Sequence, residues 1–187
     1  MSKYILVSIF LFSSFIGYSQ TASISGEVNT HTGTPIPNLN VTLKSTNFEQ
    51  RVTTDAAGAY QLTAIPTGEN YTLEMEREGE QLNGVSTFDL VQIMQSILSL
   101  ASLETSAAML AADVDQSGTI SIRDAWLMRQ LILGIQTTFE APNWRFVPVD
   151  YTYPNAVIPH TISLTQDIDN LNFIGVKAGD VSGNAGF

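Results

Sequence analysis

The sequence predicts an α+β protein of several modules: a small antiparallel β-sandwich, a helical pair with acidic loops, and a short β-rich C-terminal segment. Three observations predict this class. Apolar and polar residues alternate up to about residue 77, apolar residues recur at helical spacing over residues 78–136, and alternation returns after residue 137. We therefore expect modules over residues 20–77, 78–136 and 137–187, behind a targeting segment over residues 1–19.

The composition excludes several function classes. The 187 residues include 8 Lys plus Arg and 18 Asp plus Glu, which gives a formal net charge of -10. So acidic a surface repels phosphate backbones, and we expect no nucleic-acid partner. The sequence has no cysteine, which excludes disulfides, Cys-based zinc sites and thiol nucleophiles.

The first 19 residues have the pattern of a signal peptide. Lys3 precedes an apolar run over residues 5–16, and Gly17 and Ser19 are small residues at the positions that a signal peptidase reads. The alternative is a retained membrane anchor, although a spanning helix needs about 20 apolar residues. We expect a bacterial signal peptide, cleavage near Gln20, a secreted or cell-surface monomer, and no membrane span after cleavage.

Residues 22–77 contain short alternating segments separated by turn residues. The alternating apolar pairs are Ile24 and Val28, Val41 and Leu43, Tyr60 and Leu62, and Leu73 and Met75. The strings SGEVNTHTGTPIPNLNVTL and VTTDAAGAYQLTAIPTGENYTLEM resemble the transthyretin-like, carboxypeptidase-regulatory-like or Cna-B-like modules of secreted bacterial proteins. This resemblance implies a β-sandwich that serves as a spacer or folding unit and carries no catalytic residue.

Residues 78–136 contain an internal duplication. The segment beginning at Asp89 matches the segment beginning at Asp124 at an offset of 35 residues, and both predict helices with one apolar face. Between them, Thr105 is a suitable N-cap for a short helix that extends to Ala112, and Gly134 is expected to end the last helix. Trp126 and Trp144 are interpreted as core aromatics.

The loop before the second matched helix has the spacing of a calcium loop. Asp113, Asp115 and Ser117 alternate, so that their side chains can converge on one ion. Gly118, in sixth place, allows the sharp bend of the chain. The backbone carbonyl of Thr119, a water held by Ser121 and the carboxylate of Asp124 complete a ligand set that suits Ca²⁺. The alternative is an Asp-rich turn that caps a helix.

The first copy of this loop is weaker. Glu78 and Glu80 stand where the second loop has aspartates, and Leu82 stands where a liganding side chain is expected. The remaining expected ligands are Gly84, Ser86 and Asp89. An occupied second calcium site and a solvated turn both remain open for this copy.

The strings NGVSTFDLVQIMQSIL and LAADVDQSGTISIRDAWLMRQLILGI resemble the type I dockerin domain. This resemblance implies calcium-dependent folding and docking onto a cohesin-like protein. The positions that correspond to the partner-reading residues are Thr87, Phe88, Ile122 and Arg123. The strings WRFVP and FIGVKAGDVSGNA also resemble segments that follow dockerin-like regions in secreted bacterial surface proteins.

The end of the chain contains a third, incomplete loop. Asp180, Ser182 and Asn184 alternate like Asp113, Asp115 and Ser117, but no closing carboxylate follows. One hypothesis is that Asp180 lies close to the first loop and compensates for Glu78 or Leu82. The alternative is that Asp180 ends a strand in water.

Taken together, the sequence predicts a secreted, non-enzymatic calcium-binding interaction protein. One calcium site is expected, and a second remains open. Two alternatives are an accessory component of an extracellular polysaccharide-degrading system and a structural adhesin fragment that is stiffened by calcium. A glycosidase needs a cleft with two placed carboxylates, and a strand region of about 55 residues is too small to frame one.

Overall fold

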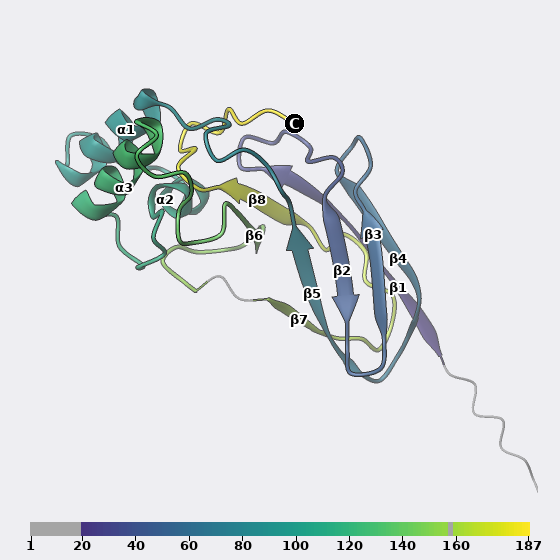
Figure 1. The fold of residues 1–187 in the computed structure, drawn as a ribbon. Coiled ribbons are helices and arrows are strands. Elements are labelled where there is room, and N and C mark those ends of the chain that lie inside the picture. The colour runs from purple at the N-terminus through teal and green to yellow at the C-terminus, as the bar shows by residue number, and fades with distance from the viewer. Residues whose placement is uncertain (1–19, 157–158) are drawn as a thin grey trace, which may run out of the picture.

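The computed structural model describes residues 20–156 and 159–187; the expected signal peptide lies outside these ranges. The strands form a β-sandwich, and three helices gather at one end of it (Figure 1). Among the described residues, no helix is long and apolar enough to span a membrane. The strands are β1 (Thr21–Thr30), β2 (Asn40–Lys44), β3 (Glu49–Thr53), β4 (Ala59–Pro66), β5 (Asn70–Glu76), β6 (Trp144–Pro148), β7 (His160–Ser163) and β8 (Phe173–Lys177).

Each of the two sheets combines strands from the N-terminal module with strands from the C-terminal segment. The first sheet has the order β4-β1-β8-β6 and the second the order β3-β2-β5-β7. The sandwich therefore extends beyond residues 20–77, since β6 and β8 complete one sheet and β7 completes the other. The C-terminal strands also contribute Trp144, Ile162 and Phe173 to the core between the sheets, beside Ile24 and Val28.

Two features of the sheets differ from the predicted antiparallel sandwich. β1 and β8 pair in parallel, with Val28 opposite Phe173. Parallel pairing is available here because the intervening helical region supplies the long crossover that parallel neighbours need. The sequence prediction also missed β3, an edge strand whose residues are all exposed or half-buried and therefore lack an apolar repeat.

The three helices form where the sequence predicts them: α1 (Thr87–Ile97), α2 (Ser106–Ala112) and α3 (Ile122–Ile132). Ser86 and Ser121 begin α1 and α3 with the same capping box, completed by Asp89 and Asp124 respectively. Thr105 caps α2 as expected. Gly134 follows α3 with a φ of 67°, a left-handed conformation that suits a residue without a Cβ at a helix end.

The helices share a second hydrophobic core with the end of the sandwich. Ile93 of α1 and Met128 of α3 occupy matching positions of the duplication and are fully buried. Leu110 of α2 joins them, together with Val176 of β8 and Val181 beyond it. Strand β8 therefore connects the two cores, and the C-terminal segment follows it directly onto the helices.

Candidate metal centre

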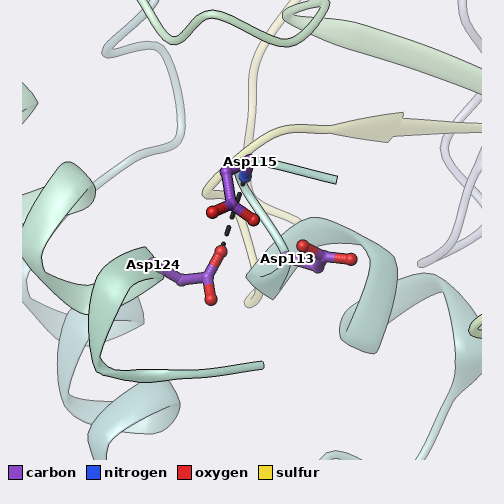
Figure 2. A group of neighbouring side chains, drawn as sticks. All are labelled: Asp113, Asp115 and Asp124. Carbon is purple, nitrogen blue, oxygen red and sulfur yellow. Dashed lines mark hydrogen bonds between the residues drawn. The ribbon is translucent and has the colours of Figure 1, made fainter. Parts of the chain in front are cut away.

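The second loop brings three carboxylates together between two helices. Asp113 is the C-cap of α2, and Asp124 lies in the first turn of α3. One carboxylate oxygen from each of Asp113, Asp115 and Asp124 lies within 4.8 Å of the other two (Figure 2). Ligands of one calcium ion, each about 2.3–2.6 Å from it, are at most about 5 Å apart. The spacing of these oxygens therefore fits a shared Ca²⁺.

Backbone amides hold Asp113 and Asp124 in place. Asp113 accepts hydrogen bonds from the backbone N–H groups of Ser117 and Gly118, both at 2.9 Å. Asp124 Oδ1 accepts from the N–H groups of Val114 at 3.0 Å and Asp115 at 3.4 Å; Figure 2 shows the latter bond. A carboxylate oxygen has two lone pairs, so an oxygen that accepts one such bond can still face a cation. At Asp124 Oδ1 a cation would take the place of the longer bond, from Asp115.

The expected hydroxyl and carbonyl ligands lie on the same loop. Ser117 Oγ lies 3.1 Å from the carbonyl oxygen of Thr119, so these two oxygen ligands converge. Ser121 Oγ is engaged in the helix cap, where it donates to Asp124 Oδ2 at 3.1 Å and accepts from the Arg123 N–H. Gly118 has a φ of 81°, which agrees with the predicted sharp bend.

The pKa values of two of these carboxyls move in opposite directions. Burial would raise the pKa of Asp115, but hydrogen bonds from Ser117 and Arg123 outweigh it, and the pKa is lowered. For Asp124, burial dominates and raises the pKa despite the hydrogen bonds from Ser121. Ionisation of Asp124 is thus less favourable in the protein alone than in water, and a cation nearby would relieve this.

Sequence reasoning missed two residues that support the loop. Arg145 of β6 is buried, donates to the backbone carbonyls of Leu110 at 2.6 Å and Asp113 at 2.8 Å, and has its pKa lowered to about 10 by burial. The Tyr153 hydroxyl donates to Asp113 Oδ2 at 3.2 Å. A lone arginine inside an apolar strand indicates a buried polar partner, and so points to the contacts of Arg145. The contact of Tyr153 depends on long-range folding and has no such signal in the sequence.

The first loop does not gather its expected acids. Glu78 and Glu80 are exposed, and they form no three-carboxylate group with Asp89 in the part of the chain that the structure describes. The structure therefore does not bring Glu78 and Glu80 together with Asp89. The physical reason is that this chain segment leaves β5 along the sandwich, where the carbonyl of Gly79 accepts a hydrogen bond from Asn143.

The second half of the first loop remains as predicted, and the C-terminal segment covers it. Asp89 is fully buried and accepts hydrogen bonds from both the N–H and the hydroxyl of Ser86. Its other oxygen accepts from the N–H of Ser182 at 2.9 Å. Asp180 is 2% exposed, so the interpretation of Asp180 as a strand end in water is wrong. Gly84 lies against Ala185 of the same C-terminal segment.

The four expected partner-contact residues, Thr87, Phe88, Ile122 and Arg123, are all exposed. Arg123 also forms an ion pair with Asp115, at 2.8 Å. Six other exposed apolar residues come in pairs that obey the 35-residue offset. These pairs are Val91 and Trp126, 50% and 53% exposed, Leu98 and Leu133, 59% and 58% exposed, and Leu100 and Ile135, 74% and 70% exposed. Trp126 is thus a surface residue and not the core aromatic that the sequence suggested, whereas Trp144 is buried.

One family model matches the N-terminal part of the chain. The family model of the carboxypeptidase regulatory-like domain matches residues 23–97, which confirms that predicted resemblance and extends it through α1. No curated protein sequence matches the chain.

Two solved structures are similar to parts of the chain. The Bacillus anthracis TIE protein has 20% identity and a TM-score of 0.29, over 33% of this chain and 12% of that one. A C-terminal fragment of the pilus adhesin SpaC from Lactobacillus rhamnosus GG has 16% identity and a TM-score of 0.29, over 35% of this chain and 27% of that one. The chain thus matches less than a third of either protein's own length.

Proposed function

We propose that this chain is a secreted, non-enzymatic calcium-binding protein whose calcium-stabilised helices dock a partner protein. The observation that carries the proposal is the convergence of Asp113, Asp115 and Asp124 within a twelve-residue loop. The donor set combines carboxylate, hydroxyl and carbonyl oxygens, which is the chemistry that Ca²⁺ prefers. Secretion is supported by the signal-peptide pattern of residues 1–19.

A bound ion would supply the positive charge that the loop lacks. Three carboxylates lie close together, and their single ion-pair partner among the described residues is the exposed Arg123. Because Asp113 ends α2 and Asp124 begins α3, a shared cation would hold these helix ends together. Binding to the folded state alone adds RT ln(1 + [Ca²⁺]/Kd), about 2.7 kcal/mol when the calcium concentration is 100 times Kd.

The test is thermal unfolding followed by circular dichroism, with 1 mM calcium or with EGTA. We expect chelation to lower both the helicity and the Tm. In Asp124→Asn the Tm should respond less to calcium than in the natural sequence, whereas in Asp150→Asn, which changes an exposed aspartate outside the loop, the full response should be kept. An unchanged Tm of the natural sequence on chelation would contradict the proposal.

The docking function is supported by one surface of the helical region. We call the set of exposed apolar residues on and beside α1 and α3 the apolar helix surface: Phe88, Val91, Leu98, Ile122, Trp126 and Leu133. Large apolar side chains exposed on neighbouring helices can serve as a protein interaction site. We infer that a cohesin-like module, or another component of the cell surface, binds here.

Titration calorimetry with a recombinant cohesin module tests this inference. Binding should require calcium and should weaken at least about tenfold in Trp126→Ala, because a buried tryptophan often contributes more than 1 kcal/mol to an interface. Arg51→Ala on the distant strand β3 is the control. Binding that is equal in EGTA and in calcium would contradict the link between the ion and the partner.

The proposal of a protein without catalysis is tested separately. It is supported by the small β module and by a chain that has no cysteine and only two histidines. A screen against common plant and bacterial glycans should give no turnover above the buffer blank. Reproducible hydrolysis that is lost in a carboxylate variant would instead favour an enzyme of polysaccharide breakdown.

A further inference from the structure

We propose that the C-terminal segment, residues 178–187, and the first loop together form a second calcium site. The C-terminal segment supplies the ligands of the first part of the loop, here called the opening half. The first loop supplies the ligands of the last part, here called the closing half. The two halves come from parts of the chain 93 residues apart. This inference deepens the proposed calcium function and rests on it. It replaces Glu78 and Glu80, which the structure leaves exposed, with Asp180, Ser182 and Asn184.

The opening half repeats the two backbone hydrogen bonds that hold the first aspartate of the second loop. Asp113 accepts hydrogen bonds from the backbone N–H groups four and five residues later, both at 2.9 Å. Asp180 does the same: its two oxygens accept from the N–H groups of Asn184 at 3.0 Å and Ala185 at 2.9 Å. The residue in fourth place is left-handed in both segments, with φ of 56° at Gln116 and 70° at Gly183.

The closing half repeats the other side of the second loop. One carboxylate oxygen of Asp124 accepts a hydrogen bond from Ser121, and the other accepts from N–H groups at the start of its loop. Likewise, one oxygen of Asp89 accepts from Ser86, and the other accepts from the N–H of Ser182 at 2.9 Å. Ser182 corresponds to Asp115, because both stand in third place after the opening aspartate. The distant segment thus replaces the start of the first loop.

The two halves meet at a point where the second loop has an ordinary peptide bond, between Gly118 in sixth place and Thr119 in seventh. Here the residue in sixth place, Ala185, packs against the residue in seventh place, Gly84. A Cβ built on Gly84 would lie 2.7 Å from the Ala185 nitrogen and Cα, so only glycine permits this approach. The side chain of Asn83 links the two segments, because it donates a hydrogen bond to the carbonyl of Gly186 at 2.7 Å and accepts one from the N–H of Gly186 at 3.1 Å.

The charges at this site favour a cation independently of the loop geometry. Asp89 and Asp180 are 0% and 2% exposed, and neither forms an ion pair within residues 20–156 and 159–187. Lys177 interacts electrostatically with Asp180, but its ammonium donates to the backbone carbonyl of Gln81, at 2.7 Å, and one positive charge does not balance two carboxylates. Burying ionised carboxylates without a counter-charge is costly. A divalent ion would balance both carboxylates.

The remaining ligands suit calcium. The hydroxyl of Ser182, the side-chain carbonyl of Asn184 and the backbone carbonyl of Gly84 occupy the third, fifth and seventh places of the loop. With two carboxylates where the second loop has three, this site should bind calcium more weakly. Its effect would be to attach the last ten residues to the start of α1.

Calcium titration calorimetry of the full mature chain tests the proposal. We expect two ions per chain, one ion for Asp180→Asn, one ion for Asp124→Asn, and two ions for the control Asp150→Asn. A single ion that disappears in Asp124→Asn and persists in Asp180→Asn would overturn the split site and leave the proposed function intact. A single ion with the opposite pattern would overturn the second-loop site, and no binding at all would overturn both.

A variant that should bind calcium more tightly provides a second test in case Asp180→Asn does not fold. Asn184 is exposed, and Asn184→Asp adds the third carboxylate that the second loop has. The calcium affinity of the weaker site should rise about tenfold in this variant, whereas Asn155→Asp, an exposed change elsewhere, should leave its affinity unchanged.

Trypsin adds a readout without calorimetry: calcium should slow cleavage after Lys177 in the natural sequence and in Asp124→Asn, and not in Asp180→Asn. Equal cleavage rates with and without calcium in the natural sequence would contradict the proposal.

Discussion

Asp89 and Asp124 each divide their two carboxylate oxygens between a helix cap and a loop. One oxygen accepts from the capping serine, and the other accepts from a backbone N–H of the segment that opens the loop. Helix start and loop closure therefore depend on the same side chain. Changing either aspartate should perturb the helix and the loop together, so the variants that test metal binding need a separate check of helicity.

Arg123 would compete with a bound metal ion for Asp115. The ion pair is 2.8 Å long and lies on an arginine side chain that is 61% exposed. Exposed pairs contribute about 0–1 kcal/mol, so Arg123→Gln should raise calcium affinity at the second loop about two- to fivefold. Calorimetry at two salt concentrations measures this, with the gain shrinking at high salt. Arg129→Gln, in the last turn of α3, is the control, and an equal gain there would point to net charge alone.

Lys177 makes stability depend on pH in the alkaline range. Burial lowers its pKa from 10.5 to about 8, against the opposing effect of Asp180 and with a small contribution from Arg145. Below pH 8 the lysine is charged in both the folded and unfolded states, so the burial penalty is complete. Above pH 10.5 it is neutral in both states and the penalty is gone.

The free energy of unfolding in EGTA should therefore gain a contribution from Lys177 between pH 8 and 10.5, of at most about 3 kcal/mol. Urea unfolding of the natural sequence and of Lys177→Met across this range isolates the contribution, because other groups titrate in both proteins. Parallel pH curves for the two proteins would show that Lys177 keeps an ordinary pKa.

The residues of the candidate centre were predictable where they are close in sequence. The spacing of Asp113, Asp115 and Asp124 predicted their convergence, because a twelve-residue loop with glycine sixth has few ways to close. Tyr153 and Arg145 were not predictable, since their contacts depend on the packing of β6 and the segment after it against the loop. Glu78 and Glu80 were assigned by spacing alone, and the path of the chain overrides spacing.

At the scale of elements, α1 and α3 are two copies of one helix with the same cap, the same buried position and the same exposed positions. Their periodicity made them predictable from the sequence, as was α2 from its cap. β3 was not predictable, because this edge strand has a single apolar residue, Val52, and is held mainly by its backbone pairing with β2.

The buried position of the duplicated helix should dominate its stability. Ile93→Ala removes a fully buried side chain between α1 and its neighbours and should lower the free energy of unfolding by about 2–4 kcal/mol. Val91→Ala, two residues earlier and half exposed, should change it by less than about 0.5 kcal/mol. Urea unfolding in calcium measures both variants. Equal effects would mean that the apolar helix surface is covered in solution.

At the scale of the whole molecule, the sandwich is completed only after the helical region has been made. β8 lies between β1 and β6, and β7 pairs with β5 at the edge of the other sheet. The sequence predicted strands at both ends of the chain but not that they share sheets, because local periodicity carries no information on pairing partners.

Residues 20–77 should therefore not fold when expressed alone. This fragment lacks Trp144, Ile162 and Phe173, which fill the core beside Ile24 and Val28. We expect poor dispersion in its amide NMR spectrum and no cooperative thermal transition, whereas residues 20–187 should show both dispersion and cooperativity. A dispersed, cooperative fragment would show that the C-terminal strands are an addition to a self-sufficient sandwich.

The parallel pairing of β1 and β8 also determines how the molecule responds to mechanical force. Tension applied at Thr21 and Lys177 pulls the two strands in opposite directions along their length, because one is loaded at its start and the other at its end. The hydrogen bonds between them are then sheared together and do not open one at a time like a zipper. A chain pulled from these two points resists rupture until this whole pairing fails.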